Sequence, residues 1–306
     1  MRPSMRQQKN AALRRLLTDT PFVVAPAVHD MFSLRLAEQA GFDSACISGA
    51  MLSYSLLGVP DIGLLTLTEC VEHCRRLTRH ARIPITADGD AGYGNPRGVH
   101  HAVELFEDAG AAGLNIEDQV VPRRWGSTRR KEVVPVGEMV AKLAAAVRAR
   151  VDDNFMIIAR TDAFGVEPIG QIIARARAYQ DAGADMLLPI GPVSATCEAD
   201  VAALVRALRI PVTLSAGTGL QPAASAGHLT LERMREIGVR RASLTTLLPL
   251  AAMRGMGQSL GTLQEALQPA SASTAESPAM SPTIDALFDT AGQMAFEEAL
   301  LESWAR

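Results

Sequence analysis

Short apolar runs alternate with amphipathic segments eight times along this chain, and this alternation limits the folds that it can adopt. The apolar runs have the length and residue types of buried strands, whereas the segments between them have helical periodicity. We predict strands at residues 22–26, 44–48, 83–88, 113–117, 155–160, 185–189, 211–215 and 242–246. We predict helices at residues 31–40, 68–80, 96–109, 137–151, 168–182, 195–208, 230–237 and 247–267. Eight such units favour an α/β fold of the TIM type, a (β/α)8 barrel, over an open doubly wound sheet, whose glycine-rich phosphate-binding turn is absent after the first strand.

The ends of three predicted helices support this alternation. Gly41, Gly110 and Gly183 each follow an alanine at the point where the helical pattern stops. Glycine adopts the left-handed conformation that closes a helix at little cost. We therefore expect each helix to end at its glycine and to lead directly into the next strand.

Composition excludes several classes of function. The 306 residues are 48% hydrophobic, which suits a large buried core, and the net charge of −3 with 4% aromatic residues argues against a nucleic-acid partner. The sequence contains neither a signal peptide nor an apolar run that could span a membrane, so we expect a cytoplasmic protein without a membrane partner. The cysteines lack metal-binding spacing, which is typical of a reduced compartment; they are Cys46, Cys70, Cys74 and Cys197.

Acidic residues follow two consecutive predicted strands. Asp88 and Asp90 stand two residues apart at the end of strand 83–88, and Glu117 and Asp118 end the next strand. Residues two apart on a strand point to the same side, and the carboxyl ends of barrel strands share one face. Single acids often cap helices or lie in solvated loops, but acids after two neighbouring strands favour a joint site. Carboxylate oxygens suit a hard divalent cation, so the pattern predicts a Mg²⁺ site.

Other polar residues fall at the same predicted edge of the barrel. The Ser48-Gly49-Ala50 segment and Ser215 end two further strands, and Arg160 ends another. A guanidinium is a planar, always ionised fork that matches a carboxylate, although a surface ion pair would explain Arg160 equally simply. The position of Arg160 at a strand end favours the binding role.

The C-terminal part of the chain has a different composition. Residues 1–268 account for the barrel, and residues 269–282 form a Ser/Pro/Ala-rich linker that lacks the apolar surface to fold alone. Residues 283–306 carry a broken apolar stripe and are predicted to form a helix. An apolar helical face on a tether needs a partner surface, which is either the barrel or a neighbouring subunit.

Six motifs together resemble the isocitrate lyase and phosphoenolpyruvate mutase superfamily over residues 21–253. They are Ser48-Gly-Ala50, Gly58-Val-Pro-Asp61, Ala87-Asp-Gly-Asp-Ala-Gly-Tyr-Gly-Asn95, Ile116-Glu-Asp-Gln119, Lys131-Glu-Val-Val-Pro135 and Ile158-Ala-Arg-Thr-Asp162. The resemblance implies a (β/α)8 barrel that holds Mg²⁺ and a 2-oxo acid or its enolate. It also implies that the eighth helix is exchanged between the subunits of a homotetramer.

The resemblance further implies roles for individual acids. Asp88 would be the direct or nearest metal ligand, and Asp61, Asp90 and Glu117 would hold metal-bound waters. Asp61 and Glu117 would also take part in catalysis together with Arg160. Mn²⁺ is an alternative ion for the same ligands. A Mg²⁺ ion chelated by a 2-oxo acid polarises the carbonyl and stabilises the enolate that remains when a neighbouring bond breaks.

Substrate contacts are implied in the same way. Ser48, Gly49 and Ala50 would bind the substrate carboxylate through the hydroxyl group and backbone amides, and Arg160 would clamp the carboxylate or the oxo oxygen. Ser215, at the end of the seventh strand, and Trp125, in the loop after the fourth, complete the expected substrate-binding set.

Two departures from the family pattern bear on the reaction. Carbon–carbon lyases such as 2-methylisocitrate lyase carry a cysteine and a histidine where this chain has Trp125 and Ser127, and a glutamate where it has Ile190. Decarboxylation is the reaction that depends least on these missing groups, because CO₂ leaves without needing a proton. The resemblance is therefore nearest to the oxaloacetate decarboxylase-like branch, and we expect decarboxylation of oxaloacetate or a similar 2-oxo acid.

Three alternatives remain open at this point. One is a 2-methylisocitrate lyase-like enzyme with a different proton donor. The second is phosphorus–carbon chemistry of the phosphoenolpyruvate mutase or phosphonopyruvate hydrolase type, because the loop residues Arg123, Arg124, Arg129, Arg130 and Lys131 could hold either a phosphonate or a carboxylate. The third is a barrel that binds a carboxylate without turning it over.

Overall fold

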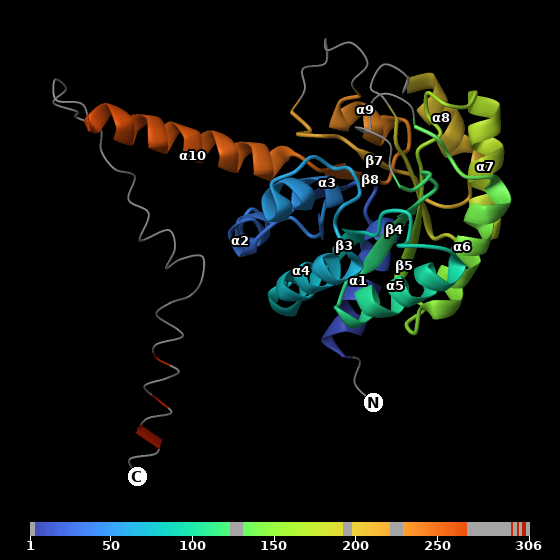
Figure 1. Ribbon diagram of the computed structural model, residues 1–306. Helices are drawn as coiled ribbons and strands as arrows, with labels where there is room; N and C mark the ends of the chain where they lie inside the picture. The colour runs from blue at the N-terminus through green and yellow to red at the C-terminus, as the bar shows by residue number, and fades with distance from the viewer. Residues whose placement is uncertain are drawn as a thin grey trace.

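Eight parallel strands and the helices around them form the described part of the molecule (Figure 1). The computed structural model describes residues 4–122, 131–191, 198–220 and 229–267, together with positions 295, 299, 302 and 303. The strands are β1 (Val23–Pro26), β2 (Ala45–Cys46), β3 (Ile85–Asp88), β4 (Gly113–Glu117), β5 (Met156–Thr161), β6 (Met186–Pro189), β7 (Thr213–Ser215) and β8 (Arg241–Leu244).

The strand order closes into a barrel. One set of strands has the order β2-β3-β4-β5-β6 and the other has the order β1-β8-β7, and every pair within them is parallel. Single parallel bridges join the two sets, from Ala27 to Cys46 and from Leu187 to Val212. The predicted (β/α)8 fold is confirmed.

Helices alternate with the strands in the predicted order. They are α2 (Met31–Gln39), α4 (Leu67–His80), α5 (Pro96–Asp108), α6 (Val136–Ala149), α7 (Ile169–Asp181), α8 (Glu198–Ala207), α9 (Leu231–Glu236) and α10 (Leu247–Ala266). Gly41, Gly110 and Gly183 have φ values of 81°, 92° and 99°, so the predicted left-handed helix ends are confirmed. Cys46, Cys70 and Cys74 are buried free thiols, and Cys197 lies outside the described residues. None of the helices in the described ranges could cross a membrane.

Three elements were not predicted from the sequence. α1 (Met5–Asp19) begins at Ser4, whose hydroxyl and backbone form a reciprocal capping box with Gln7, and it buries Leu13 and Leu17 against strand residues of the barrel. α3 (Gly49–Leu52) and the π-helix η1 (Ser53–Leu57) follow β2 directly. β2 is therefore shorter than predicted, because Ser48 already acts as the N-cap of α3.

α10 differs from the other helices in its surroundings. In Figure 1 it leads away from the barrel, and large apolar side chains along it are exposed. They are Leu250, Met253, Met256, Leu260 and Leu263. The predicted linker 269–282 and almost all of residues 283–306 lie outside the described residues, so the predicted terminal helix stays a prediction.

Candidate active site

A pocket of about 440 Å³ opens at the carboxyl ends of the strands, where the sequence predicted the site. Six predicted site residues line it: Ser48, Ala50, Asp61, Asp88, Arg160 and Ser215. Its other lining residues include Cys46, Asn115, Lys131, Ile190, Ser243 and Thr245. Of these, Lys131 was considered from the sequence only as a possible ligand of a phosphonate or a carboxylate. Gly49, Asp90 and Glu117 are not part of the lining, and Trp125 lies outside the described residues.

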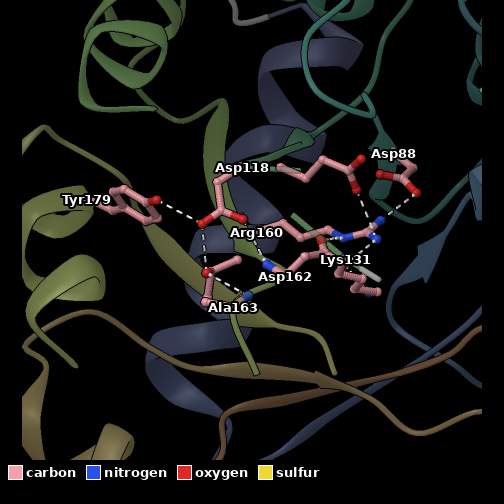
Figure 2. Close-up of polar contacts among 9 residues, drawn as sticks. Asp88, Asp118, Lys131, Arg160, Asp162, Ala163 and Tyr179 are labelled. Carbon is pink, nitrogen blue, oxygen red and sulfur yellow. Dashed lines mark hydrogen bonds and ion pairs between the residues drawn. The ribbon is translucent and has the colours of Figure 1, made fainter. Parts of the chain in front are cut away.

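Arg160 lies at the centre of a buried ion-pair network (Figure 2). Its Nη2 atom is 2.9 Å from Glu117 Oε2, its Nη1 atom is 3.4 Å from Asp88 Oδ2, and its Nε atom donates to Asp162 Oδ2 at 3.0 Å. Burial by itself would lower the pKa of the guanidinium, but Glu117, Asp162 and Asp88 raise that pKa well above its ordinary value. Arg160 is thus held as a fixed positive charge that faces the pocket.

Asp162 and Lys131 extend this network. Asp162 is fully buried, and Lys131, which lines the pocket, forms an ion pair with it. Burial would raise the pKa of Asp162, but Arg160 and Lys131 outweigh burial and lower it. Both residues belong to family motifs, but the sequence assigned no role to Asp162 and suggested Lys131 only as a possible ligand of a phosphonate or a carboxylate. The acid directly after the strand that carries Arg160 was the available signal.

Asp118 points away from the pocket, although it follows Glu117 directly. Its carboxylate accepts hydrogen bonds from the Asp162 backbone N–H, the Thr161 hydroxyl and the Tyr179 hydroxyl, each at 2.8 Å (Figure 2). Burial raises the pKa of Asp118. Neighbouring strand residues face opposite sides, so Glu117 holds Arg160 while Asp118 supports the backbone at Asp162.

The two carboxylate oxygens of Asp88 differ in their contacts. Oδ2 faces Arg160, whereas Oδ1 is buried without a hydrogen-bond partner among the described residues. Gly49 packs close to this carboxylate, because a Cβ atom at position 49 would lie 3.1 Å from Oδ2. Asp90 is beyond the end of β3, with a φ of 45°, so the strand alternation used to place it beside Asp88 stops at Asp88.

The side chains fit a weakly liganded Mg²⁺ ion better than a closed metal site. A buried carboxylate oxygen without a partner is an available hard ligand, and Asp61 lines the same pocket. In the described ranges, no group of three or more histidine, cysteine, aspartate or glutamate side chains is placed to hold an ion. Mg²⁺ commonly keeps several waters and uses only one or two protein carboxylates, so Asp88 with Asp61 nearby is a sufficient set.

Polar groups from three further strands surround the pocket. The Ser48 hydroxyl accepts from the Met51 backbone N–H at 3.5 Å, which fixes the side chain at the start of α3. Ser215 and Thr245 hydroxyls lie 3.1 Å apart. The described lining residues at the end of β6 carry no polar side chain; they are Leu188, Ile190 and Gly191.

Comparison with known proteins identifies the family. The family model described as phosphoenolpyruvate phosphomutase matches residues 13–264. The chain belongs to the phosphoenolpyruvate mutase/isocitrate lyase superfamily. An oxaloacetate decarboxylase of Rhodopseudomonas palustris is 38% identical over 75% of this chain and 77% of that protein. A probable 2-methylisocitrate lyase of Corynebacterium glutamicum is 43% identical over 59% of this chain and 58% of that protein.

Solved structures support the same assignment. A phosphonopyruvate hydrolase in complex with oxalate and Mg²⁺ has a TM-score of 0.82 and 29% sequence identity, and the match covers 96% of this chain and 99% of that chain. The superfamily therefore includes a member with Mg²⁺ bound. Because the matching relatives are named decarboxylases and lyases, this chain belongs to a superfamily of enzymes.

Proposed function

We propose that this protein is a Mg²⁺-dependent lyase that cleaves a carbon–carbon bond in a short 2-oxo acid, with decarboxylation of oxaloacetate as its reaction. The observation that carries this proposal is the composition of the pocket lining. The charged residues Arg160, Asp88 and Asp61 line the pocket, and the described lining residues at the end of β6, Leu188 and Ile190, are apolar. A second carboxylate product would need a proton donor near its carbanion, and the described lining residues from β6 to Gly191 include none.

Different residues of the pocket have different roles in binding. Arg160 has its Nε and both Nη atoms paired with carboxylates, so its orientation is set before substrate arrives. It faces the pocket as a preorganised partner for a substrate carboxylate or oxo oxygen, and Ser48, Gly49 and Ala50 bind the other end of that group. Asp61, Asp90 and Glu117 would hold waters around the Mg²⁺ ion. When bound at Asp88, Mg²⁺ supplies Lewis-acid polarisation of the carbonyl group.

The size of the pocket and the chemistry of the leaving group, CO₂, support decarboxylation. A volume of about 440 Å³ suits a small acid. CO₂ leaves without protonation, and water can protonate the remaining enolate carbon. Similarity to the oxaloacetate decarboxylase extends over three quarters of the chain, which is more than for the lyase relative.

A 2-methylisocitrate lyase-like reaction is the second candidate. The probable 2-methylisocitrate lyase shares a higher identity, 43%, over its shorter match. Lys131 lies in the pocket and bears protons, so it is a candidate donor that differs from the cysteine of those lyases. Phosphorus–carbon cleavage is the third candidate, on the likeness to phosphonopyruvate hydrolase. A non-catalytic carboxylate-binding barrel is the outcome if no substrate is turned over.

The deciding experiment is an activity screen with Mg²⁺ and, separately, Mn²⁺. Oxaloacetate, 2-methylisocitrate, isocitrate, 2,3-dimethylmalate and phosphonopyruvate would be compared by following pyruvate, glyoxylate, succinate and phosphate. We expect the highest kcat/KM for oxaloacetate, with loss of activity in EDTA and in Asp88→Asn. Faster cleavage of a methylated tricarboxylate or of phosphonopyruvate would replace this proposal with the second or third candidate. Oxalate binding without any turnover would indicate the non-catalytic barrel.

The functional unit is proposed to be a homotetramer in the cytoplasm. The exposed apolar residues Met253, Met256, Leu260 and Leu263 recur every three or four positions, so they lie along one face of α10. A second copy of the chain is the partner with a matching face, as the family resemblance implies. Met256→Glu with Leu260→Glu should lower the mass measured by light scattering, whereas Gln258→Glu should not. An unchanged mass in the double variant would contradict this assembly.

A further inference from the structure

Arg241 is a buried arginine outside the network described above. It is the first residue of β8, its side chain is 1% exposed, and it is among the largest fully buried side chains of the described residues. Nη1 donates to the Ser243 hydroxyl at 3.1 Å, and Nη2 donates to the Thr86 hydroxyl at 2.9 Å and to the Ala45 carbonyl at 3.3 Å. Arg241 thus crosses the barrel interior from β8 to β2 and β3.

The charge of this guanidinium has no counter-ion of its own in the part of the chain that the structure describes. All three of its acceptors are neutral, and it forms no ion pair with a carboxylate of the described residues. Its Nε atom is buried without a hydrogen-bond partner there. Burial lowers the pKa of Arg241, yet arginine ionises so far above neutrality that the side chain remains charged. A buried charge that is not paired is costly, so a chain that keeps one needs a reason.

Arg241 lies directly beneath the pocket. Its acceptor Ser243 and the neighbouring Cys46 both line the pocket, and Thr86 is two residues before Asp88 on β3. A ligand oxygen bound to the Ser243 hydroxyl would lie roughly 6 Å from the guanidinium, the length of two consecutive hydrogen bonds.

The charges around the pocket show what this cation can balance. Among the described residues that line the pocket or pair with its lining, the two cations Lys131 and Arg160 are outnumbered by the four carboxylates Asp61, Asp88, Glu117 and Asp162, which leaves an excess of two negative charges. Mg²⁺ would cancel that excess. A substrate with two carboxylates would then add negative charge, which Arg241 is placed to oppose as a further cation of the described residues near the pocket.

We propose that Arg241 is a specificity-determining residue that favours doubly charged over singly charged substrates by holding an unpaired positive charge under the pocket floor. It acts through space and through Ser243, without touching the reacting atoms. This proposal rests on the proposed function, because it assumes an anionic substrate beside Mg²⁺.

A charge effect has a signature that a packing defect lacks. The electrostatic interaction energy between Arg241 and a ligand scales with the charge of the ligand. If removal of Arg241 weakens the binding of a monoanion by a given factor, it should therefore weaken the binding of a dianion by the square of that factor. At roughly 6 Å, with screening as strong as in water, the factors are about 3 for a monoanion and about 10 for a dianion. The affinity for Mg²⁺, a cation, should change in the opposite direction and increase.

The test is isothermal titration calorimetry on the full chain with Mg²⁺ alone, and with oxalate and pyruvate in saturating Mg²⁺. Arg241→Gln should lower the affinity for oxalate about 10-fold and that for pyruvate about 3-fold, and it should raise the affinity for Mg²⁺. The affinities of Arg241→Lys should stay within about 2-fold of those of the wild type. Arg240→Gln is the matched control, because it removes the same charge from the adjacent residue, which contacts surface carbonyls of Thr18 and Pro21.

A second variant covers the case in which Arg241→Gln does not fold. Thr86→Asp places a carboxylate of similar size at the position of the existing acceptor and neutralises Arg241 in place, so it should reproduce the 10-fold and 3-fold pattern. Equal losses for oxalate and pyruvate, weaker Mg²⁺ binding, or values that match Arg240→Gln would overturn the proposal for Arg241. Failure of the wild-type protein to bind oxalate with Mg²⁺ would instead count against the proposed function.

Discussion

Arg160 and Glu117 form an ion pair of 2.9 Å across neighbouring strands, and the Glu117 side chain is completely buried. β4 and β5 are in register at this point, because Glu117 and Arg160 are partners in the parallel ladder. The pair is therefore fixed by backbone geometry as well as by charge. In the proposed function, a substrate carboxylate would meet a guanidinium whose position is set by the barrel.

Arg160→Lys tests whether the planar fork is needed. A lysine retains the charge but offers one ammonium group in place of the separate contacts to Glu117, Asp88 and Asp162. We expect kcat/KM to fall about 10²-fold or more, the scale for losing one preorganised donor. Steady-state kinetics measure the fall, and Arg148→Lys on α6 is the control for the substitution. Near-normal turnover would show that charge alone is sufficient at position 160.

Asp88→Ala tests the metal ligand. The substitution removes the buried oxygen that lacks a partner, while Arg160 keeps Glu117 and Asp162. Mg²⁺ held by few protein ligands cannot lose one without a large loss of affinity. We expect calorimetry to detect no Mg²⁺ binding and the activity to disappear. The free energy of unfolding should change by about 1 kcal/mol, the ordinary size for a point substitution. Wild-type turnover in this variant would remove the metal hypothesis.

Gly49→Ala tests the close packing between α3 and Asp88. The added Cβ atom would lie 3.1 Å from Asp88 Oδ2, so the carboxylate must shift. We expect Mg²⁺ affinity to fall about 10-fold, the lower end of the effect for residues that position metal ligands. Gly170→Ala is the matched control, because a Cβ atom there meets nothing within 4 Å. The control should bind Mg²⁺ normally, and equal binding by both variants would mean that Asp88 has room to move.

The sequence could predict the barrel because its signal is repeated eight times, and the glycine ends Gly41, Gly110 and Gly183 mark helix ends independently. It could also predict that Asp88 and Arg160 share a face, because strand ends determine that. It could not predict which acid pairs with Arg160, since Glu117 and Asp118 differ only in the side of β4 that they occupy. Nor could the charge-rich pattern of α1 reveal its role, because only Leu13 and Leu17 are buried apolar residues there.

Boundary errors have local causes. β2 was predicted to run to Ser48, but it ends at Cys46, because the Ser48 hydroxyl accepts a hydrogen bond at the start of α3. Asp90 was expected to continue the alternation of β3, and its positive φ ends that alternation. Both errors arise where a strand ends and a loop of the site begins, since local contacts determine the backbone conformation there.

Asp162 gives the protein a predictable dependence of stability on pH. Arg160 and Lys131 lower its pKa against the opposing effect of burial, so the folded state favours the ionised carboxylate. Its contribution is complete above the unfolded pKa of about 3.9 and is lost as the pH falls below that value towards the lower folded pKa. The difference in unfolding free energy between wild type and Asp162→Asn should therefore be constant above about pH 5 and shrink on acidification. Urea titrations between pH 3 and 7 measure it, with the exposed Asp181→Asn as control. A difference that grows as the pH falls would show that the carboxylate is not stabilised by its two cations.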